Sequence, residues 1–530
     1  MNRKLLVLPA VMGLAAPVLA GCGDSSAGSG GGDTIVVGTT DHIAVSKELP
    51  SPVDPATSYD GGTYTFFQNT FQMLLGYERS ATTPSPDAAK SCGFSDTKSE
   101  TYRCTLRDGL TFSNGHALTA EDVKFSIDRV IKIKSDYGPV SLLSNIKSVE
   151  TPDDKTVVFD LKASDATFPY KLATPAAAIV DSEVYPADKP LDGFQMAGSG
   201  PYKLDSWDDD KAVLSANPSY KGIVGKLNNS KIEVHFFKTS DEMKQALVDG
   251  KIDVVNRTFN SEQITEFGQN KYPGVKLTEA PGNSVRYMFF NLNDPSVKQK
   301  AVREAIAQLV DRDALTRDVL QRTATPLFGA VPTGVTGHSN SYFNTYGEPS
   351  RDKAAGTLSA AGITTPVKLT FSYTTDRPAT PNKQEALNLQ KQLNDSHLFD
   401  VTIKGTPWKT FLPGAVKGQW AMYSLSWLPD FPDGDTFIAP FFAEGFLNLN
   451  YPGGDIKNTL LPSTRQSADR GTTDKDFVKM QDILAKDLPM IPLYQDKQYI
   501  TTRDNVTGAE WLLNTSSTAQ FWELGRGVTG

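Results

Sequence analysis

Cysteine, histidine and net positive charge are all scarce in this chain, and each shortage excludes a class of function. Three cysteines among 530 residues exclude a small protein built on disulfide bonds. The five histidines lie far apart along the sequence, so no local zinc-binding motif is present. Lysine and arginine number 53 against 61 aspartates and glutamates, and the net charge of −8 argues against a partner made of nucleic acid.

The composition is otherwise that of a folded protein. Apolar residues make up 39% of the chain, which includes 27 phenylalanines and 18 tyrosines, enough for a sizeable core. The length predicts about three globular units, at one for every 100–200 residues.

The first residues are typical of an export signal. Arg3 and Lys4 precede an apolar stretch of 16 residues at 5–20, short of the ~20 residues that span a bilayer. The stretch ends in LAGC, which resembles the lipobox of bacterial lipoproteins, and we expect Cys22 to carry the lipid. Residues 1–21 would then be the signal peptide. An ordinary signal peptide with a chance cysteine is the alternative.

A linker follows the expected lipid site. Eight of the ten residues at 23–32 are glycine or serine, a composition typical of a flexible coil reaching about 17 Å. We therefore expect residues 22–32 to tether a folded body to the outer face of the cell membrane, the periplasmic side in a Gram-negative cell. Cys92 and Cys104 remain, and an exported compartment permits a disulfide bond between them.

Two segments have a strand–helix–strand rhythm, which predicts α/β lobes with largely parallel sheets. The N-terminal third is richer in threonine, tyrosine and phenylalanine and predicts a mixed α+β unit. The expected strands are 232–237, 252–255, 367–373 and 401–403, and the expected helices are 240–248 and about 382–393.

Six short motifs follow one another along most of the chain. They are SPVDP at 51–55, FSNG with LTAEDV at 112–123, GSGPY at 198–202, NPSY at 217–220, VREAI with DR at 302–312, and PMIPLY at 489–494. In this order they resemble the motifs of the family 5 extracellular solute-binding proteins of ABC importers, the group of the oligopeptide- and dipeptide-binding proteins.

The resemblance implies a two-lobed α/β fold, like that of type II (cluster C) periplasmic binding proteins, which encloses a ligand between its lobes. It also implies an additional α+β domain inserted into the first lobe. The implied boundaries are 33–62, 185–284 and 496–530 for lobe I, 63–184 for the inserted domain, and 285–495 for lobe II.

A candidate ligand site follows the apolar strand expected at 420–426. The next residues, WLPDFPDGD at 427–435, offer two aromatic rings and three carboxylates. Ligands of open α/β sheets bind beyond the carboxyl ends of strands, and this combination suits a cationic amine on an apolar body. A solvated acidic turn beside a packed Trp427 is the alternative.

The same stretch is similar to the family's G-W-x-x-D-Y segment, whose aspartate pairs with the α-amino group of a bound peptide. The resemblance implies Asp430 as the amine anchor, with Trp427 and Phe431 beside the ligand. Ser426 replaces the family's glycine, and Asp433-Gly434 replaces the usual Asp-Pro. Other aromatic residues are candidates for the cleft, but we expect each of them to pack in the core. They are Tyr59, Tyr64, Tyr287 and Trp408.

These features predict a lipid-anchored binding protein that captures peptides and delivers them to a permease driven by ATPase subunits. The resemblance implies oligopeptides as the cargo. The motifs G-x-S-x-G and H-E-x-x-H are missing from the sequence, so we expect no catalytic residues, metal or cofactor. We expect a monomer. The alternatives are a non-peptide cargo (a nickel chelate, an oligosaccharide or an opine), a peptide-sensing receptor and, least favoured, a secreted hydrolase.

Overall fold

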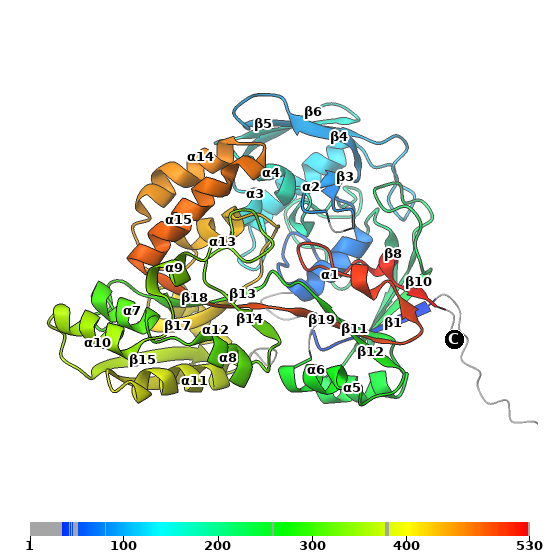
Figure 1. Ribbon diagram of the computed structural model, residues 1–530. Coiled ribbons are helices and arrows are strands. Elements are labelled where there is room, and N and C mark those ends of the chain that lie inside the picture. The colour runs from blue at the N-terminus through cyan, green and yellow to red at the C-terminus, as the bar shows by residue number, and fades with distance from the viewer. Residues whose placement is uncertain are drawn as a thin grey trace, which may run out of the picture. The chain divides into compact units, whose positions relative to one another are not determined.

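The computed structural model of the protein describes residues 34–41, 43, 45, 51–79, 81–256, 259–376 and 381–527 (Figure 1). The expected signal peptide, the lipid site at Cys22 and the linker at 22–32 lie outside these residues. Within the described part of the chain, no helix combines the length and the apolar character that crossing a bilayer requires.

A seven-stranded sheet forms around the first strand of the fold. Its strand order is β12-β19-β11-β1-β10-β9-β8, and β1 is parallel to both of its neighbours. Helix α5 connects β10 to β11, which confirms the first expected strand–helix–strand unit. The bounds are β1 Thr34–Thr39, β8 Tyr202–Trp207, β9 Lys211–Ala216, β10 Lys231–Phe236, α5 Ser240–Val248, β11 Val254–Asn256, β12 Val275–Ala280 and β19 Gln498–Arg503.

A six-stranded sheet has the order β14-β18-β13-β17-β15-β16. Helix α11 connects the parallel strands β15 and β16 and packs on both, which confirms the second expected unit. All six residues of the inner strand β13 are buried. The bounds are β13 Val285–Phe290, β14 Ala324–Pro326, β15 Val367–Thr374, α11 Asn382–Asp395, β16 Phe399–Thr406, β17 Met422–Trp427 and β18 Met490–Asp496.

The expectation of largely parallel sheets is wrong. Parallel pairing occurs around β1 and β15, whereas the other described pairs of both sheets are antiparallel. The reason is that neighbouring strands here also come from a hairpin, β8 with β9, and from chain segments that pass between the sheets. A hairpin reverses the direction of the chain, and the two segments between the sheets run in opposite directions, whereas a helical crossover keeps the strands parallel.

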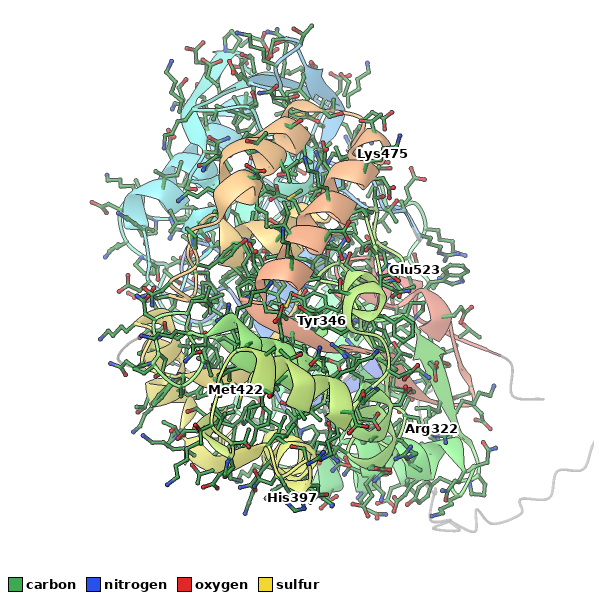
Figure 2. The ribbon with its side chains drawn as sticks, turned by 60° about the vertical axis from the view of Figure 1, so that its left-hand side comes forward. Arg322, Tyr346, His397, Met422, Lys475 and Glu523 are labelled. Carbon is green, nitrogen blue, oxygen red and sulfur yellow. A yellow bond between two sulfur atoms is a disulfide. The ribbon has the colours of Figure 1, made fainter. Side chains whose placement is uncertain are left out.

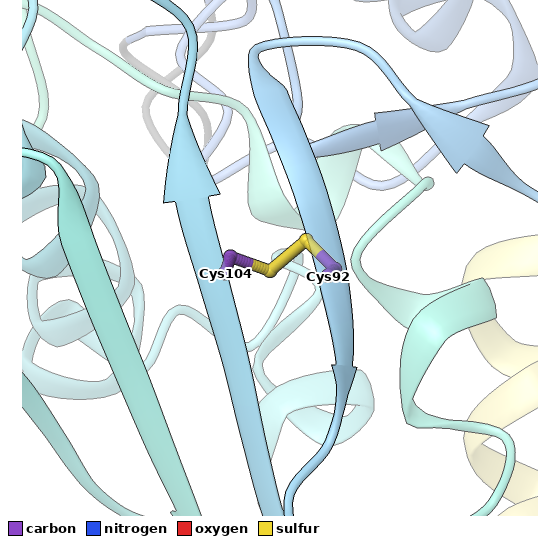
Figure 3. The surroundings of a disulfide bond; sticks show 2 residues. All are labelled: Cys92 and Cys104. Atoms are coloured by element: carbon purple, nitrogen blue, oxygen red, sulfur yellow. A yellow bond between two sulfur atoms is a disulfide. The ribbon is translucent and has the colours of Figure 1, made fainter.

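A four-stranded antiparallel sheet, β4-β5-β7-β6, forms the third unit. Helix α2 lies against β6 and β7, and Thr119 and Asp122 form a capping box at its first turn. A disulfide bond joins Cys92 of β4 to Cys104 of β5 (Figure 3). The bounds are β4 Ala89–Phe94, β5 Thr101–Leu106, α2 Ala120–Ile133, β6 Ile146–Asp153 and β7 Thr156–Leu161. The expected domain boundaries stay a prediction.

Two strand pairs connect the seven-stranded sheet to the six-stranded sheet (Figure 1). Strand β12 pairs with β19 in the first sheet, and their chain neighbours β13 and β18 pair in the second. Between the pairs, the Asp496 amide donates to the Ser284 carbonyl (2.9 Å), and Gln495 Nε2 donates to the Gly282 carbonyl (2.6 Å). A Cβ on Gly282 would lie 2.1 Å from the Asp496 carbonyl oxygen, so only glycine permits this close approach.

The largest core packs around the six-stranded sheet, where Met422 of β17 is fully buried (Figure 2). Tyr346 donates from its hydroxyl to the Ala485 carbonyl at the edge of this core (2.7 Å). The remaining helices are α1 Gly61–Thr70, α3 Val140–Leu143, α4 Phe168–Lys171, α6 Ser261–Gly268, α7 Lys300–Ala307, α8 Arg312–Asp318, α9 Ser341–Tyr346, α10 Arg351–Ala360, α12 Trp408–Val416, α13 Asp435–Phe442, α14 Leu461–Gln466 and α15 Asp474–Asp487. The remaining strands are β2 Leu75–Gly76, β3 Ser85–Pro86, β20 Val506–Thr507 and β21 Gly525–Arg526.

Candidate ligand-binding site

The acidic loop lies where the sequence predicts it, directly after strand β17. This strand lies between β13 and β15, and the loop at 428–434 leaves its carboxyl end before α13 begins. Asp433 shapes the loop, because its carboxylate accepts from the Asp435 amide (2.9 Å) and its own amide donates to the Phe431 carbonyl (2.9 Å). The loop is therefore held by local hydrogen bonds at the end of an inner strand.

The three carboxylates of this loop have different partners. Asp433 forms a two-bonded ion pair with Arg470 (2.8 and 2.9 Å), and both side chains are buried. Asp435 forms a similar pair with Arg465 (2.8 and 2.9 Å). Asp430 has no ion pair with a described basic residue. Of the three, only Asp430 is left with a negative charge that a ligand can neutralise.

The surroundings of Asp430 change its acidity. The residue is half-buried, and burial raises the pKa of its carboxyl group to about 6. Hydrogen bonds from Tyr59 and Thr436 and the positive charge of Lys171 lower this pKa, whereas the charge of Glu444 raises it. At pH 7 most of the carboxyl group is ionised, and below pH 6 most of it is protonated. The site can therefore hold a cation at neutral pH.

Tyr59 reaches this carboxylate from a distant part of the chain. Its hydroxyl donates to Asp430 Oδ1, and its ring lies 5.6 Å from the ring of Tyr64. Tyr59 is 36% exposed, although burial raises the pKa of its hydroxyl well above the usual value. The hydroxyl of Tyr64 is buried without a hydrogen-bond partner in the described chain.

Trp427 contributes an aromatic surface beside the loop. Its ring is half-buried, and its Nε1 donates to the Thr436 carbonyl (2.8 Å). The indole packs edge-on against Phe441 (4.9 Å) and against Phe446 (5.6 Å), which remains 40% exposed. The neighbouring Leu428 is 46% exposed. Trp427, Leu428 and Phe446, all near Asp430 in the sequence, therefore provide apolar surface that the body of a ligand could contact.

The expected role of Phe431 receives no support from the structure. This side chain is 2% exposed and packs in the core of the four-stranded sheet, with its ring 5.8 Å from that of Tyr170. Burying a ring of this size stabilises a protein by about 1.5–3 kcal/mol, which accounts for its turning away from the loop surface. Of the other aromatic candidates, Tyr287 is a core residue as expected and Trp408 packs on Phe411, whereas Tyr59 lies outside the described core clusters.

A hollow of about 580 Å³ lies away from the acidic loop, on the face of β15 and β16 opposite the buried side chains of these strands. Its lining includes Lys368 and Thr370 of β15 and Thr402 and Lys404 of β16, all exposed. Polar side chains that alternate with buried ones are typical of a solvated sheet face. In the described chain, no three histidine, cysteine, aspartate or glutamate side chains come together as a metal site.

The sequence matches the model of a known protein family. The model of the bacterial extracellular solute-binding proteins, family 5 (middle region), matches residues 83–447. This match covers more than half of the chain, and the protein belongs to that family. It is therefore an extracytoplasmic binding protein by class, as the order of the motifs along the sequence predicts.

Individual relatives match over most of their length. The chain is 26% identical over 490 residues to a probable D,D-dipeptide-binding periplasmic protein, DdpA, of Escherichia coli, covering 88% of this chain and 92% of that protein. HbpA2 from Haemophilus parasuis superposes with a TM-score of 0.79 at 22% identity, covering 93% of this chain and all of the other. The periplasmic binding protein DppA from Helicobacter pylori, solved with the peptide STSA, gives 0.76 at 22% identity, covering 93% and 98%. These likenesses confirm the expected two-lobed α/β fold.

Proposed function

We propose that this protein captures peptides outside the cytoplasm and delivers them to the permease of an ABC importer. One observation carries the proposal: among the residues that the structure describes, no arginine or lysine forms an ion pair with Asp430, whereas Asp433 and Asp435 each have one. The names of relatives support it, since DdpA is named a probable D,D-dipeptide-binding protein and the Helicobacter pylori protein was solved with the peptide STSA. Asp430 would receive the amino terminus of the peptide.

The chemistry of this capture follows from the charge of the carboxylate. A hydrogen bond between an ammonium group and a carboxylate away from bulk water contributes roughly 1.5–3 kcal/mol. The remaining peptide would be held through main-chain hydrogen bonds to extended backbone, which are largely independent of the peptide sequence. Trp427 and Phe446 would offer apolar surface to the first side chains.

Closure of the two lobes would complete the site. The connections at 281–284 and 495–498 are the segments that would bend, since they link the seven-stranded sheet to the six-stranded one. A ligand that contacts both lobes stabilises the closed state relative to the open one, and a permease can then distinguish loaded from empty protein. We propose 33–62, 185–284 and 496–530 as lobe I, 63–184 as the inserted domain and 285–495 as lobe II.

We further propose that Cys22 carries lipid, that residues 22–32 form a tether, and that the protein is a monomer without cofactor or catalytic residues. The ATPase and the permease would be separate partners.

The alternative of a secreted hydrolase would most simply be a glycosidase, which uses a pair of carboxyl groups. What argues against it is that two of the three loop acids, Asp433 and Asp435, already form ion pairs with Arg470 and Arg465. A carboxylate held in a two-bonded arginine pair is poorly suited to act as an acid, base or nucleophile.

Native mass spectrometry of the protein purified from its own host tests this function. We expect an additional mass that corresponds to a peptide and disappears when the protein is unfolded and refolded. Tandem mass spectrometry of the released ligand would give its sequence and length. A bound metal chelate, sugar or opine would overturn the peptide assignment. Release of hydrolysed products during incubation would overturn the assignment as a binding protein.

A further inference from the structure

The hydrogen bond between Tyr59 and Asp430 joins two different units of the fold. The two residues are 371 positions apart in the sequence. Tyr59 lies immediately before the Asp60 cap of helix α1, whose Phe66 and Phe67 pack in the core of the seven-stranded sheet. Asp430 follows strand β17 of the six-stranded sheet. The carboxylate is therefore supplied by one unit and its hydrogen-bond donor by the other.

Tyr59 can act only as a donor in this bond. Burial, with the charge of Asp430 next in importance, raises the pKa of its hydroxyl well above the usual value, so the phenol keeps its proton at neutral pH. A donated hydrogen bond stabilises the ionised carboxylate, because only the negative form is a strong acceptor. The hydroxyl donates to Oδ1, and it does not occupy Oδ2.

The two other charged groups that influence Asp430, Lys171 and Glu444, are each paired with a different side chain. Lys171 is paired with Asp165 (2.7 Å), and Glu444 is paired with Arg465 (2.8 Å). The Thr436 hydroxyl also helps to stabilise the ionised carboxylate.

Tyr64 lies beside Tyr59 and provides a contrast. Its ring is 5.6 Å from that of Tyr59, yet its buried hydroxyl has no partner in the described chain. Burial, followed by the charges of Asp430 and Asp60, raises the pKa of this hydroxyl well above the usual value. Two tyrosines of the same segment therefore face the same acid, and only one of them is hydrogen-bonded to it.

We propose that Tyr59 is a positioning residue of the amine site: its hydroxyl fixes Asp430 through Oδ1 and keeps the carboxylate ionised, so that the ligand's amine meets a charged and oriented acceptor at Oδ2. The inference rests on the proposed function, since it assumes an amine as the group that Asp430 binds. It adds that the anchor is assembled from both units of the fold. Asp430 alone, without the phenol, is a weaker anchor near neutral pH.

The test compares Tyr59→Phe with the matched variant Tyr64→Phe, each of which loses one phenol oxygen from the same segment. Isothermal titration calorimetry measures the affinity for alanine peptides of two to five residues, which have a free amino terminus and no ionisable side chain. The tightest-binding peptide is then followed from pH 5 to pH 7.5. In the unaltered protein, affinity should fall as the pH drops through about 6, because protonation of Asp430 removes the charge that holds the amine.

For Tyr59→Phe, we expect the midpoint of this fall to move up by about one pH unit, since a hydrogen bond to the charged form is lost. Affinity at pH 6 should then drop about fivefold, while affinity at pH 7.5 stays within about threefold. Tyr64→Phe should leave the profile unchanged. A merely structural role of Tyr59 would instead lower affinity equally at every pH.

The possible failures are distinguishable. If the unaltered protein binds none of these peptides, the proposed function fails and this inference fails with it. If it binds them and Tyr59→Phe keeps the same midpoint, the positioning role is refuted while the peptide assignment stands. An equal shift of the midpoint in Tyr64→Phe would also refute the assignment to the Tyr59 hydroxyl, because that variant retains the hydrogen bond to Asp430.

Discussion

Replacing Asp430 with asparagine should weaken peptide binding without weakening the fold. The substitution keeps the size of the side chain but removes the charge, so it removes the charge-assisted part of the bond to an amine. That part contributes roughly 1.5–3 kcal/mol, which corresponds to a loss of affinity of about ten- to 150-fold. The loss should be confined to ligands that carry a free amine, because an acetylated amino terminus has no positive charge.

The same substitution should leave stability unchanged or raised. Burial raises the pKa of Asp430 in the folded protein to about 6, above the value of 3.8 for an exposed aspartate. A carboxyl group with a raised pKa lowers the free energy of unfolding as the pH rises from below 4 to above 6. The full shift would correspond to about 3 kcal/mol at pH 7, and the partial exposure of this side chain reduces the effect to roughly 1 kcal/mol. Asparagine, which does not ionise, avoids this cost.

Two measurements on the purified mature protein check the prediction. Calorimetric titration compares a free-amine peptide with its acetylated form, and thermal unfolding at pH 7 reports stability. Asp400→Asn is the control, since Asp400 is an exposed acid on strand β16 of the same sheet. Unaltered affinity in Asp430→Asn would refute the amine anchor. A loss of affinity together with a lower melting temperature would show instead that the carboxylate supports the fold.

Three further outcomes are expected. Arg470→Met should lower the free energy of unfolding by about 3–5 kcal/mol in urea titrations, because it leaves the buried carboxylate of Asp433 unpaired; a change below 1 kcal/mol would contradict this. Mass spectrometry of non-reduced peptides should find Cys92 linked to Cys104, and two free thiols would disprove the bond. Cys22→Ala should release the protein from the membrane fraction of its host, whereas unchanged membrane association would contradict lipidation at this cysteine.

The regular elements were predictable because their signals are local. The unit from β15 to β16 follows from an apolar strand, an amphipathic helix and a second strand, all within 40 residues of sequence. The direction of the strands was not predictable in the same way. Strand β13 is antiparallel to both β17 and β18, and these partners lie more than 130 residues further along the chain. No local pattern reports which distant segment a strand will pair with.

The candidate site shows the same limit at the level of single side chains. In the sequence, Asp430, Asp433 and Asp435 are three similar acids in one turn. Their difference comes from Arg465 and Arg470, which lie 30 and 37 positions from their partners and neutralise two of the three acids. The interpretation of Phe431 as a ligand contact depended on its place beside Asp430, but its ring packs in the core of another sheet.

The retention of one unneutralised acid has a physical consequence for binding. Asp433 and Asp435 show that the loop can fold with arginines close enough to pair with its carboxylates. Leaving Asp430 without such a partner lowers the stability of the fold, because burial disfavours the charged form of its carboxyl group. The raised pKa of this group reflects the same effect. The positive charge of an amine that binds there offsets part of this loss of stability, and the amine also forms its own hydrogen bond with the carboxylate. A structural acid would lose nothing by being paired with an arginine, whereas a binding acid must remain unpaired until its ligand arrives, and among the three acids of this loop that condition holds for Asp430.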